Sequence, residues 1–124
     1  MNDIKIDGTP KTPGVRFIAE DGILEIKGRS IPENSIEFYK PLIDWVEAYS
    51  RNAKETTSVI IQLEYFNTAS SKCILDLFKR LEVIPKGVQV NWYYEEDDED
   101  MLEAGEDYDA IINLPFKMIE IGEI

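Results

Sequence analysis

Hydroxyl and amide side chains gather in residues 65–73 of this chain, a segment that reads YFNTASSKC. Either Asn67 or Thr68 suits the N-cap of a helix, because a side-chain oxygen there can accept an amide hydrogen that the first turn leaves unpaired. A phosphate attached at this point would meet free N–H groups and the positive end of the helix dipole. The segment therefore indicates a phosphorylation site, although Ser and Thr at helix starts more often serve only as caps.

The segment joins a predicted strand to a predicted helix. Residues 59–63, VIIQL, form a β-branched apolar run that is typical of a buried strand over 58–65. Apolar side chains then recur at helical spacing between Ile74 and Leu81, which predicts a helix over 69–83.

The rest of the chain continues this alternation. Further strands are predicted at 15–18, 23–27, 88–94 and 116–121, with helices after the cap signal at 32–35 and over 97–109. We expect Gly28 to end its strand and residues 1–13 to form a loosely held arm. The order predicts an α/β fold, a mixed β-sheet with helices packed mainly on one face. Binding sites gather at the carboxyl ends of parallel strands in such sheets, so Thr68 and the segment after residue 94 should share one edge.

Composition narrows the classes of function. At 124 residues and 44% hydrophobic content, the chain fits one domain over residues 1–124. It has no histidine, which removes the commonest general base near neutral pH and the commonest zinc ligand. Its only cysteine, Cys73, suits a reduced, partly buried thiol. No segment resembles a secretory signal or a membrane span, so we expect a cytoplasmic protein without direct membrane insertion.

The net charge of −12 is concentrated in one part of the sequence. Ten acidic residues fall between Glu95 and Asp109, with no Lys or Arg among them. This acidity argues against nucleic-acid binding, which needs a basic surface, and favours a basic protein partner. A solvated face that keeps the protein soluble is an equally good interpretation. The run lacks the ligand spacing and turn glycine of an EF-hand, and we expect no metal or other cofactor.

The order of elements and the Asn-Thr step before the second helix resemble the STAS domains of anti-anti-sigma factors, which are switched by phosphorylation at that helix start. The chain more closely resembles the SiaC family of regulatory phosphoproteins, which implies a STAS-like fold. This likeness covers nearly the whole chain and is carried by TP at 9–10 and 12–13, PENS at 32–35, IDWVE at 43–47 and YFNTASSK at 65–72.

The resemblance implies a regulatory switch. Thr68 would be the phosphoacceptor. A SiaB-type Ser/Thr kinase would add the phosphate, and a PP2C-like phosphatase of the SiaA type would remove it. The unmodified protein would bind and activate a diguanylate cyclase, or another effector, and so raise cyclic di-GMP and favour biofilm formation. A protein with this role need not be an enzyme, and we expect that this one is not.

The residues around Thr68 have predicted roles. Asn67 should cap and orient the turn, Ser70 and Ser71 should contact the phosphosite from the first turn, and Lys72 should pair with the phosphate charge. The residues expected to contact partners are Glu33, Asn34, Ser35, Tyr65, Tyr93, Glu95 and Glu96. A turn and a helix cap explain the first three of these more simply.

Three alternatives stay open. The chain could be an anti-anti-sigma-type antagonist that binds a kinase or anti-sigma partner, or a constitutive acidic scaffold in which Thr68 is only a cap. A metal-dependent enzyme that uses the carboxylate cluster is the least favoured, because the run has no recognisable ligand spacing.

Overall fold

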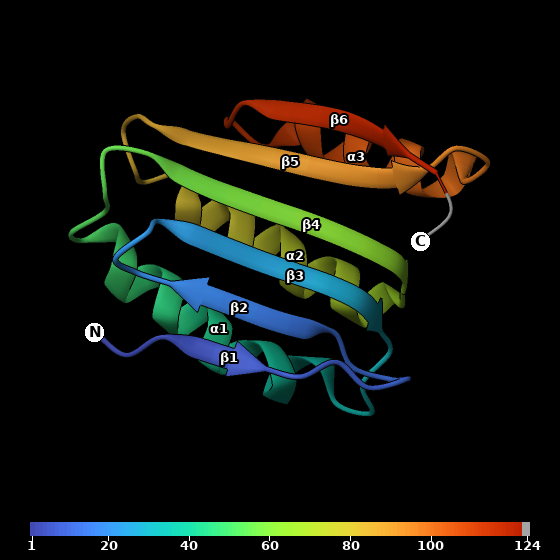
Figure 1. Cartoon of the computed structure of the whole chain (residues 1–124), viewed down its shortest axis with the longest axis horizontal. Coiled ribbons are helices and arrows are strands. Elements are labelled where there is room, and N and C mark those ends of the chain that lie inside the picture. Colours follow the sequence, from blue (N-terminus) through green and yellow to red (C-terminus); the bar gives the residue numbers. More distant parts are fainter. Residues whose placement is uncertain (123–124) are drawn as a thin grey trace.

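The computed structural model describes residues 1–122 and shows a six-stranded sheet covered on one face by three helices (Figure 1). The strands are β1 (Ile4–Ile6), β2 (Gly14–Ile18), β3 (Ile23–Ser30), β4 (Thr57–Phe66), β5 (Val88–Glu95) and β6 (Phe116–Ile121). The helices are α1 (Ser35–Ser50), α2 (Thr68–Leu81) and α3 (Glu99–Ile111). The predicted α/β fold, with helices mainly on one face of a mixed sheet, is confirmed. Within these described residues, no helix has the length and apolarity needed to cross a membrane.

The strands lie in the sheet in the order in which they occur in the chain. The pairs β1–β2 and β2–β3 are antiparallel, whereas β3 to β6 pair in parallel. One helix joins the two strands of each parallel pair, so the carboxyl ends of β3, β4 and β5 and the first turns of α1, α2 and α3 share one edge of the sheet. We call this the carboxyl edge, and it lies on the right in Figure 1.

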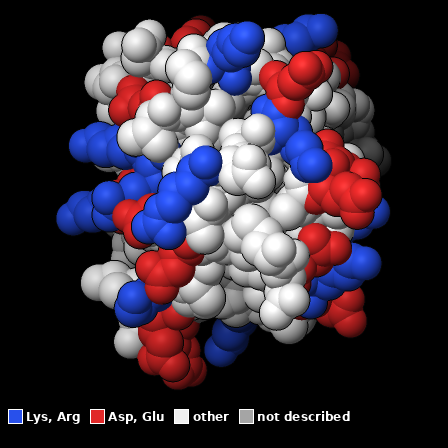
Figure 2. Space-filling view, turned by 90° about the vertical axis from the view of Figure 1, so that its left-hand side faces the viewer, with Lys and Arg blue, Asp and Glu red and all other residues white. Residues whose placement is uncertain are grey.

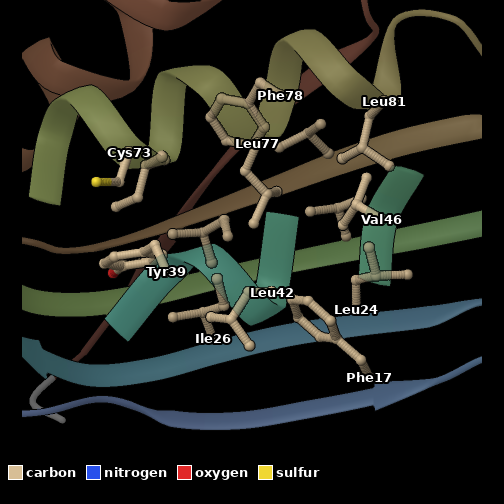
Figure 3. Packing of buried hydrophobic residues seen from close by; sticks show 14 of the residues in the cluster. Phe17, Leu24, Ile26, Tyr39, Leu42, Val46, Cys73, Leu77, Phe78 and Leu81 are labelled. Carbon is tan, nitrogen blue, oxygen red and sulfur yellow. The ribbon is translucent and has the colours of Figure 1, made fainter. Parts of the chain in front are cut away.

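The hydrophobic core lies between the sheet and the helices (Figure 3). Val59, Ile61 and Leu63, alternate residues of β4, face the helices and are almost fully buried. Leu42 of α1 and Leu77 of α2 pack into the same core as the two helices lie side by side. Full burial of a side chain of this size stabilises the fold by about 1.5–3 kcal/mol. The core therefore holds in place the two helices that flank the candidate site.

The N-terminal arm is held more firmly than the sequence predicts. Strand β1 pairs antiparallel with β2, and the indole Nε1 of Trp45 donates a hydrogen bond of 2.7 Å to the carbonyl oxygen of Asn2. The prediction of a loose arm over residues 1–13 missed β1. This strand is only three residues long, Ile-Lys-Ile, and so short an alternation of apolar and charged residues does not identify a strand in a sequence.

Strand β3 also continues past Gly28, where the sequence analysis expected it to end. Its pairing with β4 shifts through an irregularity between Gly28 and Arg29, and Gly28 adopts a φ of 109°, a conformation that glycine tolerates readily. The strand then runs on to Ser30, whose side chain is fully buried. This correction places Ser30 next to the start of α2.

Helix α3 packs closely on the sheet because it contains a glycine. A Cβ atom added to Gly105 would lie 2.5 Å from Cδ1 of the Trp92 indole. The same indole donates from Nε1 to the carbonyl oxygen of Met101, at 2.9 Å. Glycine lowers the intrinsic stability of a helix, but here it is what lets α3 approach β5.

Candidate functional site

Thr68 is the first residue of α2 and is exposed at the carboxyl edge. The N-cap is Asn67, whose backbone is extended and whose Oδ1 accepts a hydrogen bond of 2.8 Å from the amide of Ser70. The amide of Ser71 donates to the carbonyl oxygen of Asn67 at 3.0 Å. Of the two caps that the sequence allows, the structure selects Asn67. The first turn is thus held without the Thr68 hydroxyl, which is left open to solvent.

Ser70 differs from Thr68 because its side chain points into the protein. It is fully buried, and its hydroxyl donates to the carbonyl oxygen of Ser30 at 3.1 Å while it accepts from the Ser30 hydroxyl at 2.9 Å. Tyr39 completes the arrangement, with its hydroxyl 2.6 Å from that of Ser30. Burial raises the pKa of Tyr39 to about 12. Ser70 thus lies in the first turn, as the sequence predicts, but its hydroxyl is held inside by Ser30 and does not contact the phosphosite.

Ser71 is tied to the neighbouring helix α3. The hydroxyl of Tyr108 donates to the carbonyl oxygen of Ser71 at 2.8 Å and lies 3.0 Å from the Ser71 hydroxyl. The single phenol proton goes to the carbonyl, so the Ser71 hydroxyl donates to the Tyr108 oxygen. Burial raises the pKa of Tyr108 to about 12. Of the three hydroxyls at the start of α2, only that of Thr68 is left without a partner among residues 1–122.

The PENS segment forms the turn and cap before α1. Asn34 is the N-cap, and its Oδ1 accepts a hydrogen bond of 3.0 Å from the amide of Glu37. Ser35 is buried, with its hydroxyl 3.2 Å from that of Ser70. Ser35 is therefore part of the internal hydroxyl network and not the partner contact that the sequence analysis proposed. Glu33 stays exposed in the same turn.

A groove of about 680 Å³ runs between α1 and α2, with Thr68 at one of its ends. Its apolar lining comes from Ile36 and Ile43 of α1 and from Ala69 and Cys73 of α2. Burial, and secondly the nearby carboxylate of Asp76, raise the pKa of the Cys73 thiol, which favours its protonated form.

The sequence analysis did not find this groove. The available signal was the pair Ile36 and Ile43, which are seven residues apart and so lie two turns apart on the same side of α1. Ile36 is 75% exposed, which is unusual for a large apolar side chain in a helix.

Charged side chains surround the groove. They are Lys40 and Asp44 on α1, and Lys72, Asp76 and Arg80 on α2. Lys40 pairs with Asp44 at 3.0 Å, and Arg80 pairs with Asp76 at 3.5 Å and with Glu47 at 3.2 Å. Lys72 takes part in no ion pair within the described part of the chain.

Acidic residues distinguish the carboxyl edge from the opposite end of the molecule. Exposed carboxylates follow β5 at Glu96, Asp97, Glu99 and Asp100. None of the acids from 96 to 109 joins an ion pair within residues 1–122. The opposite end carries side chains of both signs around a central uncharged area (Figure 2). Because β4 and β5 are parallel neighbours, the acidic segment and the Thr68 turn share the edge, as the sequence predicts.

The remaining partner candidates do not all lie on this surface. Tyr65 is 52% exposed near the end of β4, and Glu95 is half-buried at the end of β5. Tyr93 follows the buried Trp92 and therefore faces the side of the sheet that the helices leave uncovered. Tyr93 is thus separated from the groove by the sheet. Among the described residues, no three side chains of Cys, Asp or Glu gather closely enough to hold a metal ion.

Known proteins resemble this chain over almost its whole length. The model of the SiaC family of regulatory phosphoproteins matches residues 6–121. An uncharacterized protein of Pseudomonas aeruginosa strain UCBPP-PA14 is 33% identical over 119 residues, which make up 94% of this chain and 94% of that protein.

Solved structures show the same fold. SiaC of Pseudomonas aeruginosa, crystallised with the diguanylate cyclase SiaD that it activates, superposes with a TM-score of 0.90 at 30% identity, covering 96% of this chain and 100% of that one. A structure of SiaC of the same species gives a TM-score of 0.89 at 30% identity, covering 98% of this chain and 100% of that one. The family model and these relatives match the chain over almost its whole length, in sequence and in structure. The chain therefore belongs to the SiaC family of regulatory phosphoproteins.

Proposed function

We propose that this protein is a partner-binding switch in which phosphorylation of Thr68 controls binding to a diguanylate cyclase. A SiaB-type Ser/Thr kinase adds the phosphate and a PP2C-like phosphatase of the SiaA type removes it. The unmodified protein binds and activates the cyclase. The likeness to SiaC, which was crystallised with the cyclase that it activates, supports this choice of effector.

The observation that carries the proposal is the difference among the three hydroxyls at the start of α2. Ser70 is fully buried and Ser71 is bonded to Tyr108, whereas the Thr68 hydroxyl is exposed. A kinase needs an acceptor that it can reach without unfolding the helix. Thr68 meets this requirement, which supports its assignment over its two neighbours.

The surroundings of Thr68 suit a covalent anion. A phosphate adds about −1.5 to −2 charges at neutral pH and three acceptor oxygens. The amides of Thr68 and Ala69 belong to the first turn and have no acceptor within residues 1–122, so they remain available to it. Lys72 lies one turn further along the helix and is exposed. The fold should therefore survive phosphorylation.

The effect of the phosphate falls on whatever docks at the carboxyl edge. The added bulk and charge appear beside a groove that a bare hydroxyl leaves open. An interface that loses about 3 kcal/mol loses roughly a hundredfold in affinity, which is sufficient for a switch.

The experiment has two stages. The protein is first incubated with the SiaB-type kinase and ATP, and intact mass is measured. We expect one phosphate on the wild type, one on Ser71→Ala and none on Thr68→Ala. Binding of the cyclase and its rate of cyclic di-GMP synthesis are then compared for the unmodified and the phosphorylated protein.

We expect the unmodified protein to bind and stimulate the cyclase and the phosphorylated protein to do neither. Equal labelling of the wild type and Thr68→Ala would defeat the choice of acceptor. Equal cyclase binding by both forms would leave Thr68 as a helix residue without a regulatory role and favour a constitutive scaffold.

A further inference from the structure

We propose that the outer edge of β6 binds an extended segment of a partner protein in which Lys or Arg alternates with apolar residues. The segment adds a strand to the six-stranded sheet and places its cations against carboxylates of α3. This surface is separate from the Thr68 turn at the start of α2. The inference therefore goes beyond the proposed function and does not depend on it.

The first argument is the unpaired main chain of β6. Within residues 1–122, β6 pairs only with β5, so its other side is an edge of the sheet (Figure 1). The carbonyl oxygens of Pro115 and Ile121 accept hydrogen bonds of 2.9 and 3.0 Å from amides in and just after β5. Because main-chain groups alternate in direction along a strand, those of Phe116, Met118 and Glu120 point away from β5. They form a row of donors and acceptors with which an added strand can pair.

Strand β6 lacks features by which edge strands often avoid such pairing. Its six residues contain no proline and pair with β5 without a register shift. Its side chains also suit an alternating partner. Ile119 is paired with Tyr93 and so lies with Ile121 on the face of the sheet that the helices leave uncovered. Both isoleucines are half-buried, and the apolar residues of the added segment contact them.

The second argument is the carboxylates that flank this edge. Asp107 and Ile111 face α2, because they line a hollow that residues of α2 complete. Glu99, Glu106 and Asp109 follow at intervals of seven and three residues and therefore share the other side of α3. In Figure 1, α3 lies behind β5 and β6, and α2 lies towards β3 and β4. The side of α3 turned away from α2 is thus the side towards the outer edge of β6.

Glu120 lies on the same side of the sheet as α3, because it follows Met118, the partner of the buried Trp92, by two residues. We call Glu99, Glu106, Asp109 and Glu120 the carboxylate row. All four are exposed, and none joins an ion pair within the described part of the chain.

The carboxylate row decides which occupant fits the edge. A strand added to β6 directs alternate side chains to the two faces of the sheet. Lys or Arg on the helix side complements the carboxylate row, and apolar residues on the other side meet the two isoleucines. A second copy of this chain fits less well, since pairing of two β6 strands would bring two carboxylate rows together.

The test measures the binding of synthetic peptides to the full chain by fluorescence anisotropy. The probe has blocked ends, the length of β6 and strictly alternating Lys and Val. Its control has the same composition, with the Lys and Val residues in two blocks. We expect the alternating peptide to bind at least about tenfold more tightly, because only its extended form places every cation on one face.

N-methylation of the peptides tests the main-chain pairing. Methyl groups on all amides of the alternating peptide remove the donors along both of its edges and leave its charge unchanged. We expect its binding to weaken at least about tenfold, whereas the same modification should change the weaker binding of the block peptide less than about twofold.

Two neighbouring substitutions on α3 locate the site. Glu106→Lys and Asp107→Lys change the net charge equally, but only Glu106 belongs to the carboxylate row. At physiological salt, where charges are screened over about 8 Å, Glu106→Lys should weaken binding of the alternating peptide about tenfold and Asp107→Lys less than about threefold. Unfolding in urea checks that both variants are folded.

Three results would overturn the proposal. Equal binding of the alternating and block peptides, or binding that survives N-methylation, would show that the acids attract cations without an added strand. Equal effects of the two substitutions would place the binding away from β6. A dimer in sedimentation velocity that the alternating peptide dissociates would make a second copy the occupant. None of these results bears on the switch at Thr68, which the kinase and the cyclase test separately.

Discussion

The hydroxyl of Tyr108 donates a hydrogen bond of 2.8 Å to the carbonyl oxygen of Ser71, and this bond ties α3 to the first turn of α2. The acidic helix and the candidate phosphosite are thereby held together at the carboxyl edge. The pairing also accounts for why Ser71 has no hydroxyl proton to offer a docking partner, because its hydroxyl donates to the Tyr108 oxygen.

Removing this hydroxyl should weaken the fold. We expect Tyr108→Phe to lower the free energy of unfolding by about 1–2 kcal/mol, because a buried hydrogen bond to the Ser71 carbonyl is lost and the Ser71 hydroxyl loses its partner. Urea unfolding measures the change. Tyr65→Phe is the control, since Tyr65 is half-exposed and its replacement should alter the stability by less than about 0.5 kcal/mol. Equal effects of the two variants would contradict the role given to the bond.

Stability should decline in alkaline solution. The pKa values of Tyr39 and Tyr108 rise from 10.0 to about 12 in the folded protein, chiefly because burial disfavours the phenolate. The unfolded chain therefore releases these protons first, and the stability that the neutral phenols provide is complete below pH 10 and is lost between about pH 10 and pH 12.

Urea unfolding at a series of pH values above 9 tests this expectation. In Tyr108→Phe one of the two groups is absent, so the stability should fall less steeply with pH than in the wild type. An unchanged slope would show that Tyr108 ionises in the folded protein as easily as in the unfolded chain.

A charge at position 68 should affect stability according to its sign. Thr68→Asp should raise the free energy of unfolding, and Thr68→Lys should lower it, each by about 0.3–1 kcal/mol at low salt, because the N-terminus of α2 carries partial positive charge. The difference should shrink as salt is added. Thermal unfolding of both variants at two salt concentrations provides the measurement.

The other end of the same helix supplies the control for this effect. Val83 lies just beyond the last turn of α2, where the partial charge is negative. Val83→Asp should therefore lower the stability and Val83→Lys should not. If the sign of the effect were the same at both ends, the helix dipole would not be its cause.

Gly105→Ala should destabilise the protein even though alanine is the better helix former. The added methyl group would lie 2.5 Å from the indole of Trp92, and overpacking of this kind costs about 1–3 kcal/mol. Urea unfolding followed by tryptophan fluorescence reports both the stability and the environment of the indole. Ala110→Gly, at an exposed site of the same helix, should cost at most about 1 kcal/mol through helix propensity alone. A gain in stability for Gly105→Ala would refute the packing argument.

The sheet and its helices could be predicted because their signals are local. The alternation in β5 and the apolar run of β4 follow from which side chains face the helices, and the chain order of strands and helices restricts the topology. The missed strand β1 has only three residues, and the extension of β3 depends on an irregular pairing with β4 that no local pattern encodes.

The part of the candidate site that depends on local sequence signals could also be predicted. The cap residue and the exposed hydroxyl follow from the position of Asn67 and Thr68 in the helix. The burial of Ser70 and Ser35 depends on the approach of β3 and α1, which bring Ser30 and Tyr39 to them from elsewhere in the sequence. The groove likewise exists only because two helices lie side by side, so the sequence pattern of either helix alone could not reveal it.

The parallel course of the three helices sets the background potential at the carboxyl edge. Their N-termini, capped by Asn34, Asn67 and Asp98, all open there, and their partial positive charges add. The carboxylates around α3 oppose this potential from the same edge. Because mobile ions screen the exposed helix ends as well as the carboxylates, a charged group placed at this edge should respond to both most strongly in dilute electrolyte.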